Sequence, residues 1–356
     1  MKFLEILTIA KNSLASDIHL SIGVPPIMRI NGKLEKVNDD ILSIADLEAF
    51  VDEILTKEQK TKLADEKSQG AVDIAYSISN VGRFRVNVYL QRGTYAVAIR
   101  VVALVIPSME ELGLPSIIKE LSKLKRGLIL VTGPTGSGKS TTLATMIDHM
   151  NKNRHEHIIT IEDPIEFLHK HENCIINQRE IGYDTFSFSE ALRSALRQDP
   201  DIILVGEMRD LDTIATAITA AETGHLVLST VHTVGAASTI DRIVDVFPPY
   251  QQQQIKVQLS SVLKGVISQQ IMPTSNGGSR VAAFEIMTST TAMQNLIREG
   301  KTHQLQTVIQ TSSNLGMISM DDSLIDLYKR KKIKKEVLLR YSVDRKAVER
   351  EINSYY

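Results

Sequence analysis

The segment Gly133–Ser140 reads G-P-T-G-S-G-K-S and matches the complete phosphate-binding pattern G-x-x-x-x-G-K-[ST]. The apolar run Leu128–Val131 precedes it and predicts a buried strand, and Ser140–Met150 follows it with the pattern of a helix. In such a strand–loop–helix unit, the loop amides and the helix N-terminus converge on phosphate oxygens. The sequence therefore predicts a nucleoside-triphosphate site at the edge of a P-loop domain.

This loop supplies groups for both ATP and Mg²⁺. The Lys139 ammonium can reach the β- and γ-phosphates, and the Ser140 hydroxyl can ligate the metal ion. The residues expected to contact the nucleotide are Gly133, Pro134, Thr135, Gly136, Ser137, Gly138, Lys139, Ser140 and Thr141.

Composition limits the classes of protein to which the chain can belong. A length of 356 residues predicts two domains. The 41 basic and 42 acidic residues give a net charge of −1, which argues against bulk binding of nucleic acid. The single cysteine, Cys174, excludes an internal disulfide and a four-cysteine zinc site, and it fits a reduced, cytoplasmic setting. The longest apolar run, at about 96–106, is shorter than the roughly 20 residues that span a bilayer.

The pattern of elements changes along the chain. Residues 1–104 predict a smaller α+β domain with short strands, including a hairpin at Asn31-Gly32. Residues 105–114 predict a linker, and 115–356 an ATPase domain with a helical tail.

Alternating strands and helices in the second domain predict an α/β fold with a parallel sheet covered by helices on both faces. Strands are expected at 157–161, 202–205 and 225–231, and a hairpin-like stretch at 174–183. Beyond about Gly235 the chain is expected to be mostly helical.

Titratable side chains follow several of these strands, at the sheet edge where α/β proteins bind ligands. Glu207 can orient the attacking water or accept its proton, and the alternative is a surface carboxylate. Glu162 or Asp163 can polarise water or hold Mg²⁺ through its hydration shell. His232 can lie near the γ-phosphate, although a lone histidine is often structural.

Arginines of the first domain are candidates to complete the site. Arg83 and Arg85 share one strand face by the period of two, and Arg100 lies on a later strand. They could reach the nucleotide of a neighbouring subunit, and the alternative is ordinary surface arginines. A basic run at 329–335 could bind an anionic surface, but a solvated helix end is the simpler interpretation.

Four sequence blocks together resemble the type II/IV secretion and pilus-motor superfamily of P-loop ATPases. They are the P-loop, an aspartate box at 161–167, a Walker B block at 202–210 with glycine at position 206, and a histidine box at 224–233. Blocks at 15–20, 82–87, 177–180 and 241–248 are similar to the PilT family of type IV pilus retraction (twitching motility) ATPases.

The resemblance implies a homohexameric motor. Its members join a PAS-like N-terminal domain to a RecA-like core, bind ATP between the domains and remove pilin subunits at the pilus base. The implied partner is an inner-membrane platform protein, and the implied location is the cytoplasmic face of the membrane. One departure is Gln294, which replaces the first arginine of a motif tied to retraction in that family.

Three other functions remain open at this stage, and one of them is a nucleotide-dependent structural hub with negligible turnover. A pilus-assembly or type II secretion ATPase belongs to the same superfamily, but assembly ATPases usually carry a tetracysteine zinc insert that a chain with only Cys174 cannot form. A RecA-like nucleic-acid motor has only the basic run in its favour, and this run lacks interleaved aromatic residues.

Overall fold

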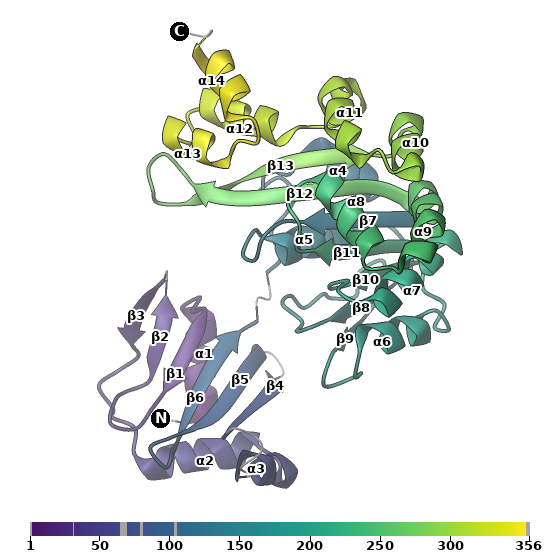
Figure 1. The fold of residues 1–356 in the computed structure, drawn as a ribbon. Helices are drawn as coiled ribbons and strands as arrows, with labels where there is room; N and C mark the ends of the chain where they lie inside the picture. The colour runs from purple at the N-terminus through teal and green to yellow at the C-terminus, as the bar shows by residue number, and fades with distance from the viewer. Residues whose placement is uncertain (1, 31, 65–69, 79–80, 103–104, 354–356) are drawn as a thin grey trace. The chain divides into compact units, whose positions relative to one another are not determined.

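The computed structural model describes residues 2–30, 32–64, 70–78, 81–102 and 105–353. These residues divide into two compact units (Figure 1). One unit comprises 1–105 with 166–168, and the other comprises 106–165 with 169–356. Each unit has its own sheet and its own hydrophobic core. The expected α/β class is confirmed, whereas the domain boundaries at 104 and 115 stay predictions.

The N-terminal unit forms an antiparallel sheet in the order β3-β2-β1-β6-β5-β4 over its described residues. The strands are β1 (Asp17–Leu20), β2 (Ile27–Ile30), β3 (Lys33–Lys36), β4 (Ala71–Ile78), β5 (Gly82–Gln91) and β6 (Thr94–Val101). The helices are α1 (Phe3–Asn12), α2 (Ile44–Ile54) and α3 (Lys57–Ala64). Strands β2 and β3 pair antiparallel, as the hairpin prediction requires, although Asn31 itself lies outside the described residues.

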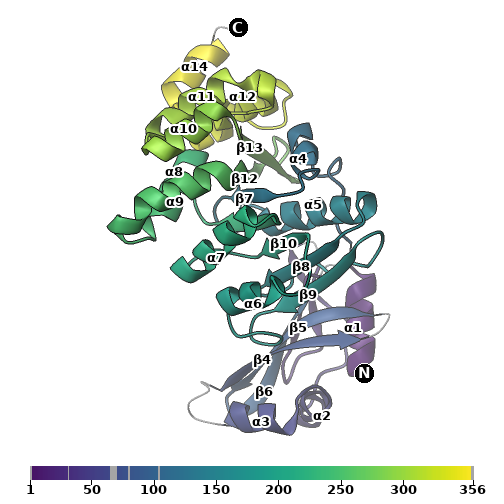
Figure 2. The same cartoon turned by 90° about the vertical axis from the view of Figure 1, so that its right-hand side faces the viewer.

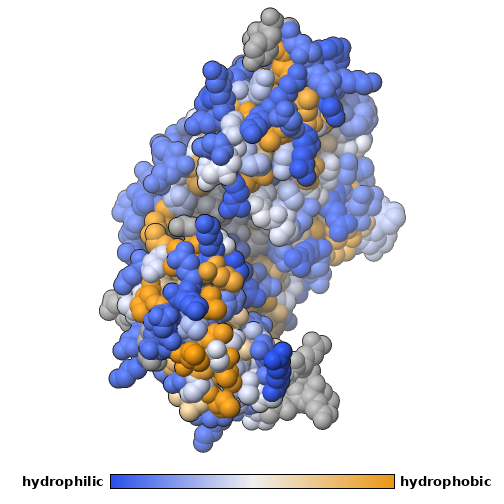
Figure 3. Space-filling view, turned by 90° about the vertical axis from the view of Figure 1, so that its left-hand side faces the viewer, coloured by the Kyte–Doolittle hydropathy of each residue, from blue (hydrophilic) through white to orange (hydrophobic). Residues whose placement is uncertain are grey.

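Side chains of β5 alternate between the two faces of this sheet. Phe84, Val86 and Val88 of β5 are buried in a core with apolar residues of α1 and α2. The intervening residues of β5, which include Arg85, therefore lie on the opposite face. Apolar side chains also gather on the surface of this unit, in the lower part of Figure 3. Its exposed large hydrophobic residues include Leu4, Leu14, Leu34 and Ile41.

The second unit is built on a sheet in the order β13-β12-β7-β11-β10-β8-β9 within its described residues. The strands are β7 (Gly127–Thr132), β8 (His157–Glu162), β9 (Ile175–Glu180), β10 (Ile202–Val205), β11 (Leu226–Val231), β12 (Leu263–Pro273) and β13 (Arg280–Thr288). Neighbouring strands from β12 to β9 run parallel, and β13 is antiparallel to β12.

Helices cover both faces of this sheet (Figure 2). Helices α4 (Ser116–Leu121) and α5 (Lys139–Asn153) pack with Ile129 and Val131 of β7. The opposite face, which includes Leu128 and Leu130, packs against α6 (Phe188–Ala195), α7 (Leu211–Glu222), α8 (Ala236–Asp245) and α9 (Pro249–Val262). Because β7 contributes apolar residues to both cores, it is buried along its whole length.

The C-terminal helices are α10 (Thr291–Glu299), α11 (Leu305–Thr311), α12 (Met320–Lys329), α13 (Lys335–Tyr341) and α14 (Arg345–Asn353). Helices α12 to α14 share a small core with Met272 and Ala283 of the β12–β13 ribbon. No helix in the described part of the chain is long and apolar enough to cross a bilayer.

One sequence prediction about this unit is wrong and another is incomplete. The stretch at 174–183 is not a hairpin, because β9 pairs in parallel with β8, with Ile175 opposite His157. The chain beyond Gly235 is mostly helical, as predicted, but the prediction missed β12 and β13, which add two long strands to the sheet. Strand β12 follows α9 without an intervening turn, and polar Ser268 and Gln269 interrupt its apolar run, so no local pattern marks the change.

Candidate nucleotide site

The strand order brings the predicted site segments side by side. Strands β7, β11, β10 and β8 are consecutive neighbours in the sheet, and the chain leaves all four at the same edge. This edge therefore carries the P-loop, then His232, Glu207 and Glu162 in spatial order.

The P-loop is tightly packed against β12. Gly133 has a φ of 142°, and a Cβ at this position would lie 2.3 Å from the Gln269 carbonyl oxygen and 2.6 Å from Ser137 Oγ. Only glycine fits so close an approach between two backbone segments. Ser137 Oγ is buried and has no hydrogen-bond partner within the described ranges, so it is available to an anion held by the loop.

Lys139 folds back over this loop. Its Nζ donates to the Gly133 carbonyl at 2.9 Å and to the Pro134 carbonyl at 3.1 Å. The same ammonium lies 3.4 Å from Nδ1 of His232, and the lysine is only 8% exposed. A positive charge is thus held at the centre of the loop, where phosphate oxygens would bind.

His232 connects Lys139 to Glu207. The Nε2 of His232 lies 3.5 Å from Glu207 Oε2, which also contacts an Arg209 guanidinium nitrogen at 2.8 Å. A neutral imidazole with its proton on Nε2 suits both neighbours, because Nδ1 can then accept from the ammonium while the N–H lies on the side of the carboxylate. Three residues predicted separately from the sequence therefore form one contact chain.

Glu162 is held by its own strand and by β9. Its Oε1 accepts from Thr160 Oγ1 at 2.6 Å and from Gln178 Nε2 at 3.1 Å. These donors orient the carboxylate at the end of β8, two strands away from β11. Asp163 and Ser140 are both exposed, so their hard oxygen atoms are accessible to a hydrated divalent cation.

The glycine that replaces the usual Walker B acid has a steric cause. A Cβ on Gly206 would lie 3.1 Å from the Ile161 carbonyl oxygen and 3.3 Å from Glu162 Cα. The Gly206 carbonyl in turn accepts from Thr230 Oγ1 at 2.6 Å. Strands β8, β10 and β11 are thus drawn together beneath the candidate carboxylates.

Sequence reasoning missed three supporting residues. Buried Gln269 donates from Nε2 to the Ser137 carbonyl and accepts at Oε1 from Thr142 Oγ1 at 2.8 Å. No sequence signal marked it, because its strand was itself missed. Gln178 and Arg209 lie within recognised sequence blocks, so their positions were visible but their contacts were not.

A cavity of about 400 Å³ lies beside these groups. Thr135 of the P-loop borders it together with His232, Arg209 and Arg242. An imidazole and two guanidinium groups therefore face a space next to the phosphate loop, which favours an anionic ligand there.

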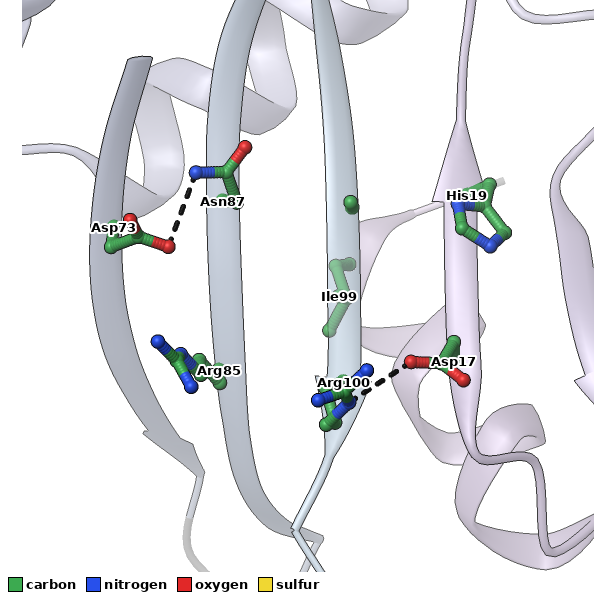
Figure 4. Close-up of a pocket in the computed structure, with 8 residues that line it drawn as sticks. Asp17, His19, Asp73, Arg85, Asn87, Ile99 and Arg100 are labelled. Carbon is green, nitrogen blue, oxygen red and sulfur yellow. Dashed lines mark hydrogen bonds and ion pairs between the residues drawn. The ribbon is translucent and has the colours of Figure 1, made fainter. Parts of the chain in front are cut away.

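The predicted arginines belong to the N-terminal unit. Arg85 and Arg100 are cross-strand neighbours that line a pocket of about 170 Å³ with Asp17, Asp73 and Asn87 (Figure 4). Arg100 Nε lies 3.1 Å from Asp17 Oδ1, and Asn87 Nδ2 donates to Asp73 Oδ1 at 3.1 Å. Arg83 and Arg85 alternate with buried Phe84, as the strand pattern predicts. The part of all three arginines in nucleotide binding stays a prediction.

Known proteins share both the sequence and the fold of this chain. The type IV pilus retraction ATPase PilT of Pseudomonas aeruginosa is 48% identical over 336 residues, which cover 94% of this chain and 96% of the relative. A twitching motility protein of Neisseria gonorrhoeae is 46% identical over 86% of this chain and 81% of its own length.

A crystal structure described as the pilus retraction motor PilT with bound ADP is 47% identical and aligns with a TM-score of 0.90. The alignment covers 98% of this chain and 99% of that one. The family described as type II/IV secretion system protein matches residues 4–353. The resemblance seen in the motifs is thereby confirmed, and the chain belongs to the type II/IV secretion system protein family.

Proposed function

We propose that this chain is a Mg²⁺-dependent ATPase that powers retraction of type IV pili. The observation that carries the proposal is the contact chain from Lys139 through His232 to Glu207 at the mouth of the P-loop. It sets a phosphate-binding cation and a carboxylate that can position water at one sheet edge, with a histidine between them, and phosphoryl transfer to water uses the first two. Similarity to a pilus retraction ATPase over nearly the whole chain supports the biological role.

Each group has a distinct task in this proposal. Lys139 and the loop amides bind the β- and γ-phosphates. Glu207 orients the attacking water and accepts its proton, while Arg209 and His232 hold the carboxylate in place. Glu162, fixed by Thr160 and Gln178, positions the water from the neighbouring strand end.

Ser140 would hold the metal ion, with Asp163 acting through bound water. Mg²⁺ neutralises charge on the phosphates when it is bound. Arg83, Arg85 and Arg100 would supply further positive charge from an N-terminal unit. Because these arginines and the P-loop lie on separate units, a homohexamer in which neighbouring subunits complete each site is the assembly that we infer.

In the cell, we infer that the ring works in the cytoplasm at the inner face of the membrane, bound to a platform protein of the pilus machinery. The nearest alternative is a pilus-assembly or type II secretion ATPase. A nucleic-acid motor is less favoured, because Lys329 and Arg330 of the basic run contact Glu351 and Asp326 on the surface.

The biochemical test is the steady-state ATPase rate at increasing protein concentration. We expect the rate per chain to rise with concentration as subunits associate. Lys139→Ala and Glu207→Gln should each lower it by about 100-fold or more, and Arg85→Ala should lower it at every concentration. Arg350→Ala, an exposed arginine on α14, is the matched control. A concentration-independent rate that is unaffected by Arg85→Ala would contradict the shared site.

The biological test separates retraction from assembly. Cells that lack the gene and carry Lys139→Ala should assemble surface pili but fail to retract them. Loss of the pili themselves would instead favour an assembly ATPase. ATPase activity stimulated by single-stranded DNA or RNA would favour the nucleic-acid motor.

A further inference from the structure

Glu285 is a buried carboxylate outside the contact chain described above. It lies on β13 at the edge of the sheet and is 2% exposed. Burying a carboxylate is costly unless hydrogen bonds compensate for the lost water, so its partners indicate why it is there.

The first partners lie at the start of α8. Glu285 is directly opposite Ser268 in the β12–β13 ladder, so both side chains point to the same face of the ribbon. Ser268 Oγ accepts from the Gly235 backbone N–H at 2.9 Å, and Glu285 Oε1 accepts from the Ala236 N–H at 2.8 Å. Two cross-strand neighbours thus bind consecutive amides at the start of α8, where backbone N–H groups have no partner within the helix.

The other partners lie in the C-terminal helices. The Gln306 side chain of α11 and the backbone N–H of Met320, the first residue of α12, lie close enough to the Glu285 carboxylate to oppose the rise in its pKa that burial causes. The adjacent strand residue Ile286 forms a two-way backbone bridge with Ile318, just before α12. The Glu285 carboxylate is therefore bonded to the start of α8, and its strand is bridged to the segment just before α12.

The segment that Ser268 and Glu285 hold begins immediately after His232. Thr233 Oγ1 contacts Thr239 Oγ1 at 2.7 Å, which closes the segment onto the first turn of α8. Between His232 and Ala236 the chain is thus held at residues 233, 235 and 236. Any shift of the α8 N-terminus would move His232 relative to Lys139 and Glu207.

We propose that Glu285 is a positioning residue for ATP turnover, which fixes the segment that carries His232 and ties it to the C-terminal helices α11 and α12. The inference rests on the proposed ATPase function. It assigns to the β12–β13 ribbon the task of transmitting the position of the C-terminal helices to the candidate site. Glu285 acts through His232 and does not itself touch the nucleotide.

The test compares Glu285→Ala, Glu285→Gln and Ser268→Ala in the full chain, with Glu222→Gln on the surface of α7 as the matched control. Glu285→Ala should lower kcat by about tenfold, because misplaced catalytic groups slow chemistry. The Kd for ADP should change less than twofold, since the P-loop contacts remain. Glu285→Gln keeps an acceptor for Ala236 and should recover most of the kcat.

A second readout does not depend on turnover. Hydrogen exchange of a peptide covering 232–240 should become at least about fivefold faster in Glu285→Ala and Ser268→Ala, because each loses an acceptor of a helix-start amide. A peptide covering 139–150 should exchange as in the wild type. The control Glu222→Gln should change neither peptide.

The outcomes are distinct. Wild-type kcat and wild-type exchange at 232–240 in both Glu285→Ala and Ser268→Ala would overturn the proposal. If Glu285→Ala fails to fold, Ser268→Ala decides by the same two measurements. An equal loss of kcat in Glu285→Ala and Glu285→Gln with unchanged exchange would also overturn the positioning role. If the wild type hydrolyses no ATP, the proposed function fails. The exchange measurement still tests whether Glu285 and Ser268 hold the segment after His232.

Discussion

Replacement of Gln269 by leucine tests how the P-loop is supported. The side chain is 1% exposed and links the Ser137 carbonyl to the Thr142 hydroxyl, so it ties the loop to the first turns of α5. Leucine has a similar volume, so the substitution removes the hydrogen bonds without opening a large cavity. The expected change is therefore a loss of polar contacts alone.

The magnitude follows from the two partners that leucine leaves buried. Each unsatisfied polar group costs about 1–3 kcal/mol. Allowing for partial relaxation, we expect Gln269→Leu to lower the free energy of unfolding by about 2–4 kcal/mol. If displacement of the loop costs about 1.4 kcal/mol of the free energy of ADP binding, the Kd for ADP rises about tenfold.

The assay is urea unfolding together with titration of a fluorescent ADP analogue. Gln270→Leu is the matched control, because its side chain is next along β12 on the opposite face and is only half-buried. Adding Thr142→Val to Gln269→Leu removes one of the unsatisfied groups, so the double variant should recover about 1 kcal/mol. Equal stability and equal Kd in Gln269→Leu and Gln270→Leu would refute the reasoning.

Three further predictions concern the site and the strands that support it. Gly206→Ala should destabilise the chain by about 1–3 kcal/mol and lower kcat, because the new Cβ meets backbone atoms at 3.1 and 3.3 Å. Gly278→Ala, whose Cβ would meet only Asn276 Oδ1 at 4.0 Å, should change neither urea stability nor ATPase rate. Gln178→Leu removes a donor to Glu162 Oε1 and should lower kcat with little change in the Kd for ADP, whereas exposed Asn177→Ala should leave both unchanged. Burial raises the pKa of Glu285, against the effect of its hydrogen-bond donors, and the charge of Asp321 adds to the rise. The folded state therefore binds this proton more tightly than the unfolded state. The resulting contribution to the free energy of unfolding is fully present below the ordinary carboxyl pKa, and it is lost as the pH rises through the pKa of Glu285 in the folded state. Urea unfolding from pH 4.5 to 8 should show this loss in the wild type and not in Glu285→Gln; parallel pH profiles would contradict it.

Much of this protein could be predicted from local patterns. The spacing of apolar residues reveals short-range features. These are the P-loop between the strand Leu128–Val131 and its helix, and the carboxylates that follow apolar strands. The fold class and the family followed from these features, and the structure and the known relatives confirmed them. Because parallel strands present their carboxyl ends at one edge, even the grouping of Lys139, His232 and Glu207 could be expected.

Only the tertiary structure decided how these groups are held. Gln269 lies 132 residues from Ser137, and Glu285 lies 49 residues from Ala236, so no local pattern links either pair. Both supports depend on β12 and β13. Strand β12 continues from α9 without a turn, and buried polar residues interrupt the apolar pattern of both strands. Strand pairing is set by contacts distant in sequence, which is why the chemistry of the site was visible in the sequence and its framework was not.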